Sequence, residues 1–154
     1  MTRRRWTMAS TSVAVMVALV ARASTSTAIA VQRFAVVPAF DHTPVFFFFF
    51  SDDNRRDVST QASSPVSGEF ARITMRVSLD CPAAGCDPWD RYGTIGLVTE
   101  PGTGDSPATV IELARFMTPY GVGGRWSLDV TDMRPMLTGD VTLAAHIDTW
   151  VGPG

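Results

Sequence analysis

The sequence predicts an all-β protein, built as an antiparallel β-sandwich, and two observations support this prediction. Short stretches in which apolar and polar residues alternate recur along the second half of the chain, as in strands that bury one face. Clusters of Gly, Pro and Asp separate these stretches, the longest at residues 101–107. Several short strands with turns between them are typical of β-sandwiches.

The clearest strand is expected at residues 73–79, where every second residue is apolar. A short capped helical turn is expected at 131–137, closed by Gly139. The remaining strands are expected at 93–99, 110–116, 126–130 and 141–147, with a Gly-rich loop at 119–124.

Residues 1–30 resemble a secretory leader. A basic start at residues 3–5 precedes an apolar stretch at 13–21, and small-residue sites follow. The apolar stretch is shorter than the roughly 20 residues of a spanning helix, so no membrane contact is expected after leader removal. We therefore predict a secreted protein, extracellular or periplasmic. An uncleaved anchor or a misassigned start codon is the alternative.

Residues 31–69 form a second segment, which is hard to interpret. Five Phe residues stand in a row at 46–50, and three interpretations are open: a strand buried on both sides, a peculiar edge strand, or a sequencing or reading-frame artefact. The polar stretch at 52–67 predicts a loop. The sandwich itself is expected at residues 70–154.

Composition excludes two classes of function. Thirteen basic residues, all Arg, against fifteen acidic residues give a net charge of −2, which does not favour nucleic-acid binding. His42 and His146 lie far apart and have no cysteine at zinc-like spacing, so neither a metal site nor a cofactor is predicted.

The segment at 81–91 carries the strongest chemical signal. Cys81 and Cys86 are the two cysteines of the chain, and at this spacing they can close a small ring by oxidation; a reactive thiol pair is the alternative. Trp89, Asp90 and Arg91 follow directly, and they offer a stacking surface, an acid/base group and a clamp for an anion or hydroxyl.

From about residue 70 to 152 the chain resembles the N-terminal domain of the bacterial peptide-N-glycosidase F family. Four stretches carry the resemblance in order, at 81–92, 114–120, 129–132 and 147–150. The resemblance implies a jelly-roll β-sandwich without its last strand. It also implies that a second sandwich, present in the family, is missing from this chain.

The resemblance implies hydrolysis of the amide that joins N-acetylglucosamine to an Asn side chain. The main catalytic aspartate of the family falls on Asp90, and a second acidic residue falls on Asp148, where the family has Glu. A further Glu of the family belongs to the second sandwich. Activity of this chain alone is therefore expected to be weak or absent, and whether it is an enzyme stays open.

The expected partners are an N-glycan or glycopeptide and a second sandwich domain. Trp150 is a candidate platform for a sugar ring, or else part of an exposed polar strand face. Trp89 either contacts the ligand or packs under its loop, and Arg91 either holds a substrate oxygen or orients Asp90. A non-catalytic carbohydrate-binding module and a truncated gene product are the alternative functions.

Overall fold

The computed structural model describes residues 5–8, 11–15, 34–46, 54–64 and 70–148. Nearly all regular structure in these residues is strand, and the expected all-β fold is confirmed. The strands are β1 (Arg5–Met8), β2 (Thr11–Val15), β3 (Ala35–Phe40), β4 (Thr43–Phe46), β5 (Asp57–Ser64), β6 (Thr74–Leu79), β7 (Tyr92–Glu100), β8 (Thr109–Met117), β9 (Gly124–Asp129) and β10 (Gly139–Ile147).

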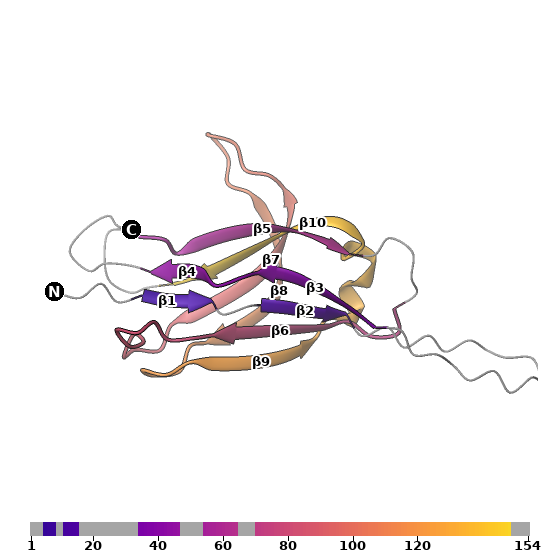
Figure 1. Cartoon of the computed structure of the whole chain (residues 1–154). Helices are drawn as coiled ribbons and strands as arrows, with labels where there is room; N and C mark the ends of the chain where they lie inside the picture. The colour runs from indigo at the N-terminus through magenta and orange to yellow at the C-terminus, as the bar shows by residue number, and fades with distance from the viewer. Residues whose placement is uncertain (1–4, 9–10, 16–33, 47–53, 65–69, 149–154) are drawn as a thin grey trace, which may run out of the picture.

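Two four-stranded antiparallel sheets form the body of the molecule (Figure 1). One has the order β5-β10-β7-β8 and the other β3-β2-β6-β9, while β1 and β4 pair as a separate ribbon. A single hydrophobic core joins side chains from both sheets, as expected for a sandwich. At one edge of the core, the rings of Phe116 on β8 and Trp126 on β9 lie with their centroids 4.8 Å apart.

The strand periodicity is borne out in the burial of the side chains. On β6, Met75, Val77 and Leu79 are each 1 % exposed, whereas Arg76 between them is exposed. The four later strands also form at the predicted places, with bounds shifted by one or two residues. The alternation of apolar and polar residues was therefore a sufficient guide to this half of the chain.

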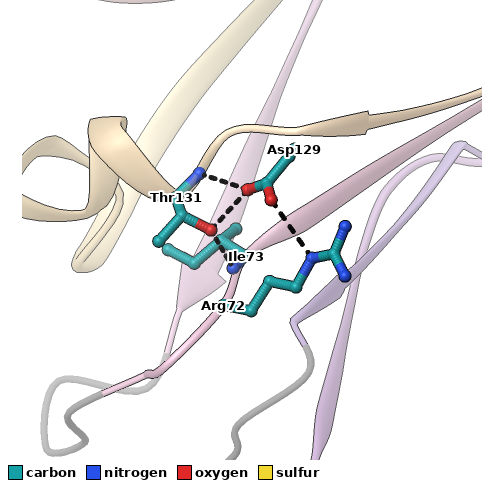
Figure 2. A network of polar contacts seen from close by, with 4 residues as sticks. All are labelled: Arg72, Ile73, Asp129 and Thr131. Carbon is teal, nitrogen blue, oxygen red and sulfur yellow. Dashed lines mark hydrogen bonds and ion pairs between the residues drawn. The ribbon is translucent and has the colours of Figure 1, made fainter.

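The expected helical turn is present as the 3₁₀ helix η1 (Thr131–Met136), and Gly139 follows with the positive φ of a left-handed residue. The expected cap is wrong in detail, because the N-cap is Val130 and makes no side-chain hydrogen bond. Instead, Asp129 accepts hydrogen bonds from the backbone N–H and hydroxyl of Thr131. Figure 2 shows this carboxylate at the centre of a network that also includes Arg72 and Ile73.

The loop expected at 52–67 is wrong, because Asp57–Ser64 forms the eight-residue strand β5. β5 is an edge strand that pairs antiparallel to β10. Only Val58, Ala62 and Ser64 turn inward and are buried. An edge strand with so few apolar residues gives little alternation, and its composition resembles that of a loop.

Two predictions about the first half of the chain stay predictions: the secretory leader at residues 1–30 and the strand at 46–50. Within the expected leader, β1 pairs with β4, and β2 lies between β3 and β6. The expected strand at 46–50 falls outside the described residues except for Phe46, which ends β4.

Candidate functional site

The segment after β6 is held by a covalent ring and a buried ion pair. Cys81 and Cys86 form a disulfide, which confirms the ring. One residue further, the Asp87 carboxylate accepts a hydrogen bond from Nε of Arg91 at 2.9 Å, and both side chains are almost fully buried. The other oxygen of Asp87 accepts the backbone N–H of Trp89 at 3.1 Å. A carboxylate that bonds across its own loop in this way fixes the path of residues 87–91.

Backbone bonds tie this segment to the loop that follows β8. The N–H of Thr118 donates to the Arg91 carbonyl at 2.8 Å, and the Arg91 N–H donates to the Thr118 hydroxyl at 2.7 Å. The N–H of Gly121 donates to the Asp87 carbonyl at 2.9 Å. The two loops therefore form one supported surface at the end of the sandwich that lies on the left in Figure 1.

Asp90 belongs to the first of these loops and is half-buried. The Tyr120 hydroxyl donates a hydrogen bond to the Asp90 carboxylate, and this bond, followed by the negative charge of Asp90, raises the pKa of Tyr120. Both effects oppose ionisation of the phenol, because a tyrosinate would lose the bond and face a like charge. The ring of Tyr120 is 63 % exposed, so the pair is open to solvent.

Asp148 lies at the same end of the molecule. It follows β10 directly, and its backbone N–H donates to the carbonyl of Tyr92 at 2.7 Å. Tyr92 is two residues after Asp90, and two residues span at most about 7 Å. The side chain of Asp148 is exposed. The structure thus brings the backbones of the two candidate catalytic residues together from positions 58 apart in sequence.

The other candidate residues have different surroundings. Trp89 is 61 % exposed, which contradicts the alternative that it packs under its loop, and its contact with a ligand stays a prediction. Trp150 lies outside the described residues.

Three comparisons with known proteins bear on this site. Residues 101–153 match the family described as "Peptide-N-glycosidase F, N terminal". Over 87 residues the chain is 36 % identical to peptide-N(4)-(N-acetyl-beta-D-glucosaminyl)asparagine amidase F of Elizabethkingia miricola, a match that covers 53 % of this chain and 23 % of that protein.

Solved structures agree with the sequence match. A structure of recombinant peptide:N-glycanase F is 30 % identical, with a TM-score of 0.55 over 66 % of this chain and 33 % of that one. A structure of the glycosylasparaginase PNGase F from Flavobacterium meningosepticum is 27 % identical, with a TM-score of 0.52 over 67 % and 33 %. The chain resembles the N-terminal domain of peptide-N-glycosidase F. It spans only about a quarter to a third of these relatives.

The match to the peptide-N-glycosidase F family begins at residue 101, so it includes Asp148 but not the segment at 81–91. The role of Asp90 therefore stays a prediction. The two predicted roles of Arg91, holding a substrate oxygen or orienting Asp90, are also untested; the structure shows its side chain buried and paired with Asp87.

No group of three or more His, Cys, Asp or Glu residues that can hold a metal ion occurs in the described ranges. The same ranges contain no helix with the length and hydropathy needed to cross a membrane.

Tyr120 and Asp87 were not predicted as parts of the candidate site. Tyr120 reaches Asp90 from a loop some 30 positions later. Asp87 is a core residue at 1 % exposure, and its carboxylate bonds within its own loop. A polar residue beside a Pro gives no sign in the sequence that it will be buried.

Proposed function

We propose that this chain is a peptide-N-glycosidase F-like domain that takes part in hydrolysis of the amide between N-acetylglucosamine and Asn. The observation that supports this most is the placement of Asp90 and Asp148 at one end of the sandwich, joined through Tyr92. The names of the relatives point to the same amide. The predicted N-glycoprotein substrate and secretion of the chain are part of this proposal, and the disulfide favours an oxidising compartment.

In this proposal Asp90 positions a water molecule and accepts its proton. The Tyr120 hydroxyl is the hydrogen-bonding neighbour of the Asp90 carboxylate, and in this proposal it helps to orient Asp90 toward the water. Asp148, from a different strand, is the second carboxylate and is suited to a proton transfer at the departing nitrogen. Trp89 offers an exposed aromatic face beside Asp90 for the sugar ring.

We further propose that the domain alone is a weak enzyme. Asp90 is only half-buried and Asp148 is exposed, so bulk water reaches both carboxylates. Electrostatic stabilisation of a transition state is stronger where water is excluded. A second sandwich domain packed over this end can supply that enclosure.

The test is release of glycan from a denatured N-glycoprotein by the purified chain. We expect slow release that Asp90→Asn abolishes and that Asp80→Asn, a matched change at the end of β6, leaves intact. Release that persists in Asp90→Asn would overturn the assignment of Asp90.

The exposed rings of Trp89 and Tyr120 also fit the second candidate, a non-catalytic carbohydrate-binding module. In that case no glycan is released, but the chain is retained on a glycopeptide column, and Trp89→Ala abolishes the retention.

A further inference from the structure

The outer face of the β5-β10-β7-β8 sheet carries a groove of about 760 Å³. This volume falls in the range of known ligand sites, roughly 300–1,000 Å³. The floor is formed by outward-facing residues of the two central strands, Thr94, Gly96 and Val98 on β7 and Thr142 and Ala144 on β10.

The groove is hollow over the two central strands because the side chains of its floor are small. Gly96 lies opposite Ala144, and a Cβ atom at Gly96 would be 2.3 Å from a methyl carbon of Val110. Glycine at this position therefore allows Val110 of β8 to lie against the floor. The turn between β7 and β8 projects beyond the body of the sandwich (Figure 1), and Pro101 and Gly102 of this turn line one end of the groove.

On both rims of the groove a carboxylate contacts a basic side chain. On the β5 side, Nδ1 of His146 lies 2.7 Å from the carboxylate of Asp57. On the β8 side, Arg115 donates two hydrogen bonds of 2.8 Å to Glu112, and these lower the pKa of the Glu112 carboxyl. Each of the two lining carboxylates thus has a basic partner, so neither is a free anion that points into the groove for a charged ligand.

A β-bulge in β8 makes the contact between Glu112 and Arg115 possible. Ile95 pairs with Ala114 and Gly96 pairs with Glu112, so Leu113 is the extra residue on β8. In a regular strand, residues three apart point to opposite faces of the sheet. The bulge resets this alternation and places Glu112 and Arg115 on the same face.

The groove begins beside the candidate site. Tyr92 lines its end, with the Arg115 guanidinium carbon 5.2 Å from the ring centroid. The backbone carbonyl of Tyr92 also accepts a hydrogen bond from the backbone N–H of Asp148. A ligand that extends from Asp90 and Asp148 along β7 therefore passes over Tyr92 and onto the floor.

We propose that this groove binds a neutral oligosaccharide along β7 and β10. Sugar rings have an apolar face and a rim of hydroxyls. The floor matches them with apolar surface at Val98 and Ala144 and with hydroxyl groups at Thr94 and Thr142. The location rests on the geometry of the sheet alone, whereas the choice of a sugar rests on the proposed function.

The test is a titration of the isotope-labelled full chain with a neutral high-mannose oligosaccharide, followed by NMR. The oligosaccharide has a free reducing end and no amide, so the outcome does not depend on hydrolysis. We expect chemical-shift changes at the amides of Thr94, Gly96 and Ala144. We also expect Ala144→Trp to raise the Kd at least tenfold by filling the floor.

Two further variants keep this test decisive. Thr142→Arg blocks the same floor with a different side chain, in case Ala144→Trp fails to fold. Ser127→Trp makes a matched change on the outer face of the other sheet and is expected to leave the Kd unchanged. A sialylated oligosaccharide is expected to bind no more tightly than the neutral one.

The proposal is overturned if shift changes are confined to the loops around Asp90, if blocked and control variants bind equally well, or if millimolar oligosaccharide causes no change. Self-association of the chain that Ala144→Trp abolishes would show that a second copy occupies the groove, which also overturns it. Shift changes on the groove together with no glycan release would instead count against the hydrolytic function alone.

Discussion

The two ends of the sandwich are each organised around one aspartate, but in opposite environments. At the end that carries the candidate site, the Asp87 side chain is 2 % exposed and bonds to the buried Arg91. At the other end, the Asp129 side chain is 50 % exposed and holds Arg72 and Thr131 (Figure 2). The buried network fixes the loop that carries the candidate residues Trp89 and Asp90, whereas the exposed one closes the turn into η1.

The largest expected effect follows from this difference in burial. Asp87→Asn removes the charge that balances the buried guanidinium, and loss of one partner of a buried pair costs about 3–5 kcal/mol. Asp129→Asn is the matched change at the exposed end, and its effect on the free energy of unfolding is expected to be much smaller because solvent screens the pair. Urea unfolding of both variants measures the difference. Equal losses would remove the distinction between the two ends.

The covalent ring adds a second difference between the ends. Replacing both Cys81 and Cys86 by Ala opens a ring closed over a sequence separation of 5 residues, and the chain-entropy cost of so short a ring is roughly 2 kcal/mol. We expect amide hydrogen exchange to accelerate at residues 82–92 and not at 131–137. Equal acceleration at both ends would show that the ring stabilises the sandwich as a whole and does not act on the candidate loop.

The contact between Asp90 and Tyr120 gives a smaller, spectroscopic effect. The raised pKa of Tyr120 means that the contact stabilises the fold below the unfolded pKa, and that this contribution is lost as pH rises through the folded pKa. We expect Asp90→Asn to lower the pKa of Tyr120 and Asp90→Ala to lower it further, since Asn keeps a hydrogen-bond acceptor. Tyrosinate absorbance in a Tyr92→Phe background isolates Tyr120, because the chain has two tyrosines. An unchanged titration in both variants would contradict the contact.

The sequence was a good guide where structure depends on local alternation, and a poor one where it depends on contacts between segments. The strands from β6 to β10 were predicted because each buries one face. β5 was missed because an edge strand needs few apolar residues, and Val58 and Ala62 alone do not form a visible period. The pair of Glu112 and Arg115 was equally hidden, since three-residue spacing places side chains on one face only where a bulge intervenes.

The candidate site shows the same limit. The ring at Cys81 and Cys86 follows from their spacing, and the site around Asp90 was proposed from the neighbouring residue types. The burial of Asp87 was not predicted, because its residue type and neighbours do not indicate it. The partner of Asp90 was not predicted, because Tyr120 lies in the loop after β8. That loop meets the segment at 81–91 only when the sheet has formed.

The smallest expected effect is the acid titration of Asp129. The Thr131 hydroxyl and then the Thr131 backbone N–H lower the pKa of Asp129, and burial opposes them. The charge of Arg72 and its hydrogen bond also lower this pKa, each by less than the effect of burial. A lowered pKa means that this network stabilises the fold above the unfolded pKa and loses its contribution as pH falls through the folded pKa. Thr131→Ala removes the hydroxyl and is expected to raise the pKa of Asp129, whereas Thr131→Ser keeps the hydroxyl and is expected to leave it low. Carboxylate carbon shifts measured by NMR across the acid range distinguish these outcomes. The opposite end is fixed by a disulfide and a buried ion pair. We therefore expect the pKa of Asp129 to change in Thr131→Ala without any change in the amide signals of residues 82–92. A simultaneous change in those signals would mean that the two ends are coupled through β6.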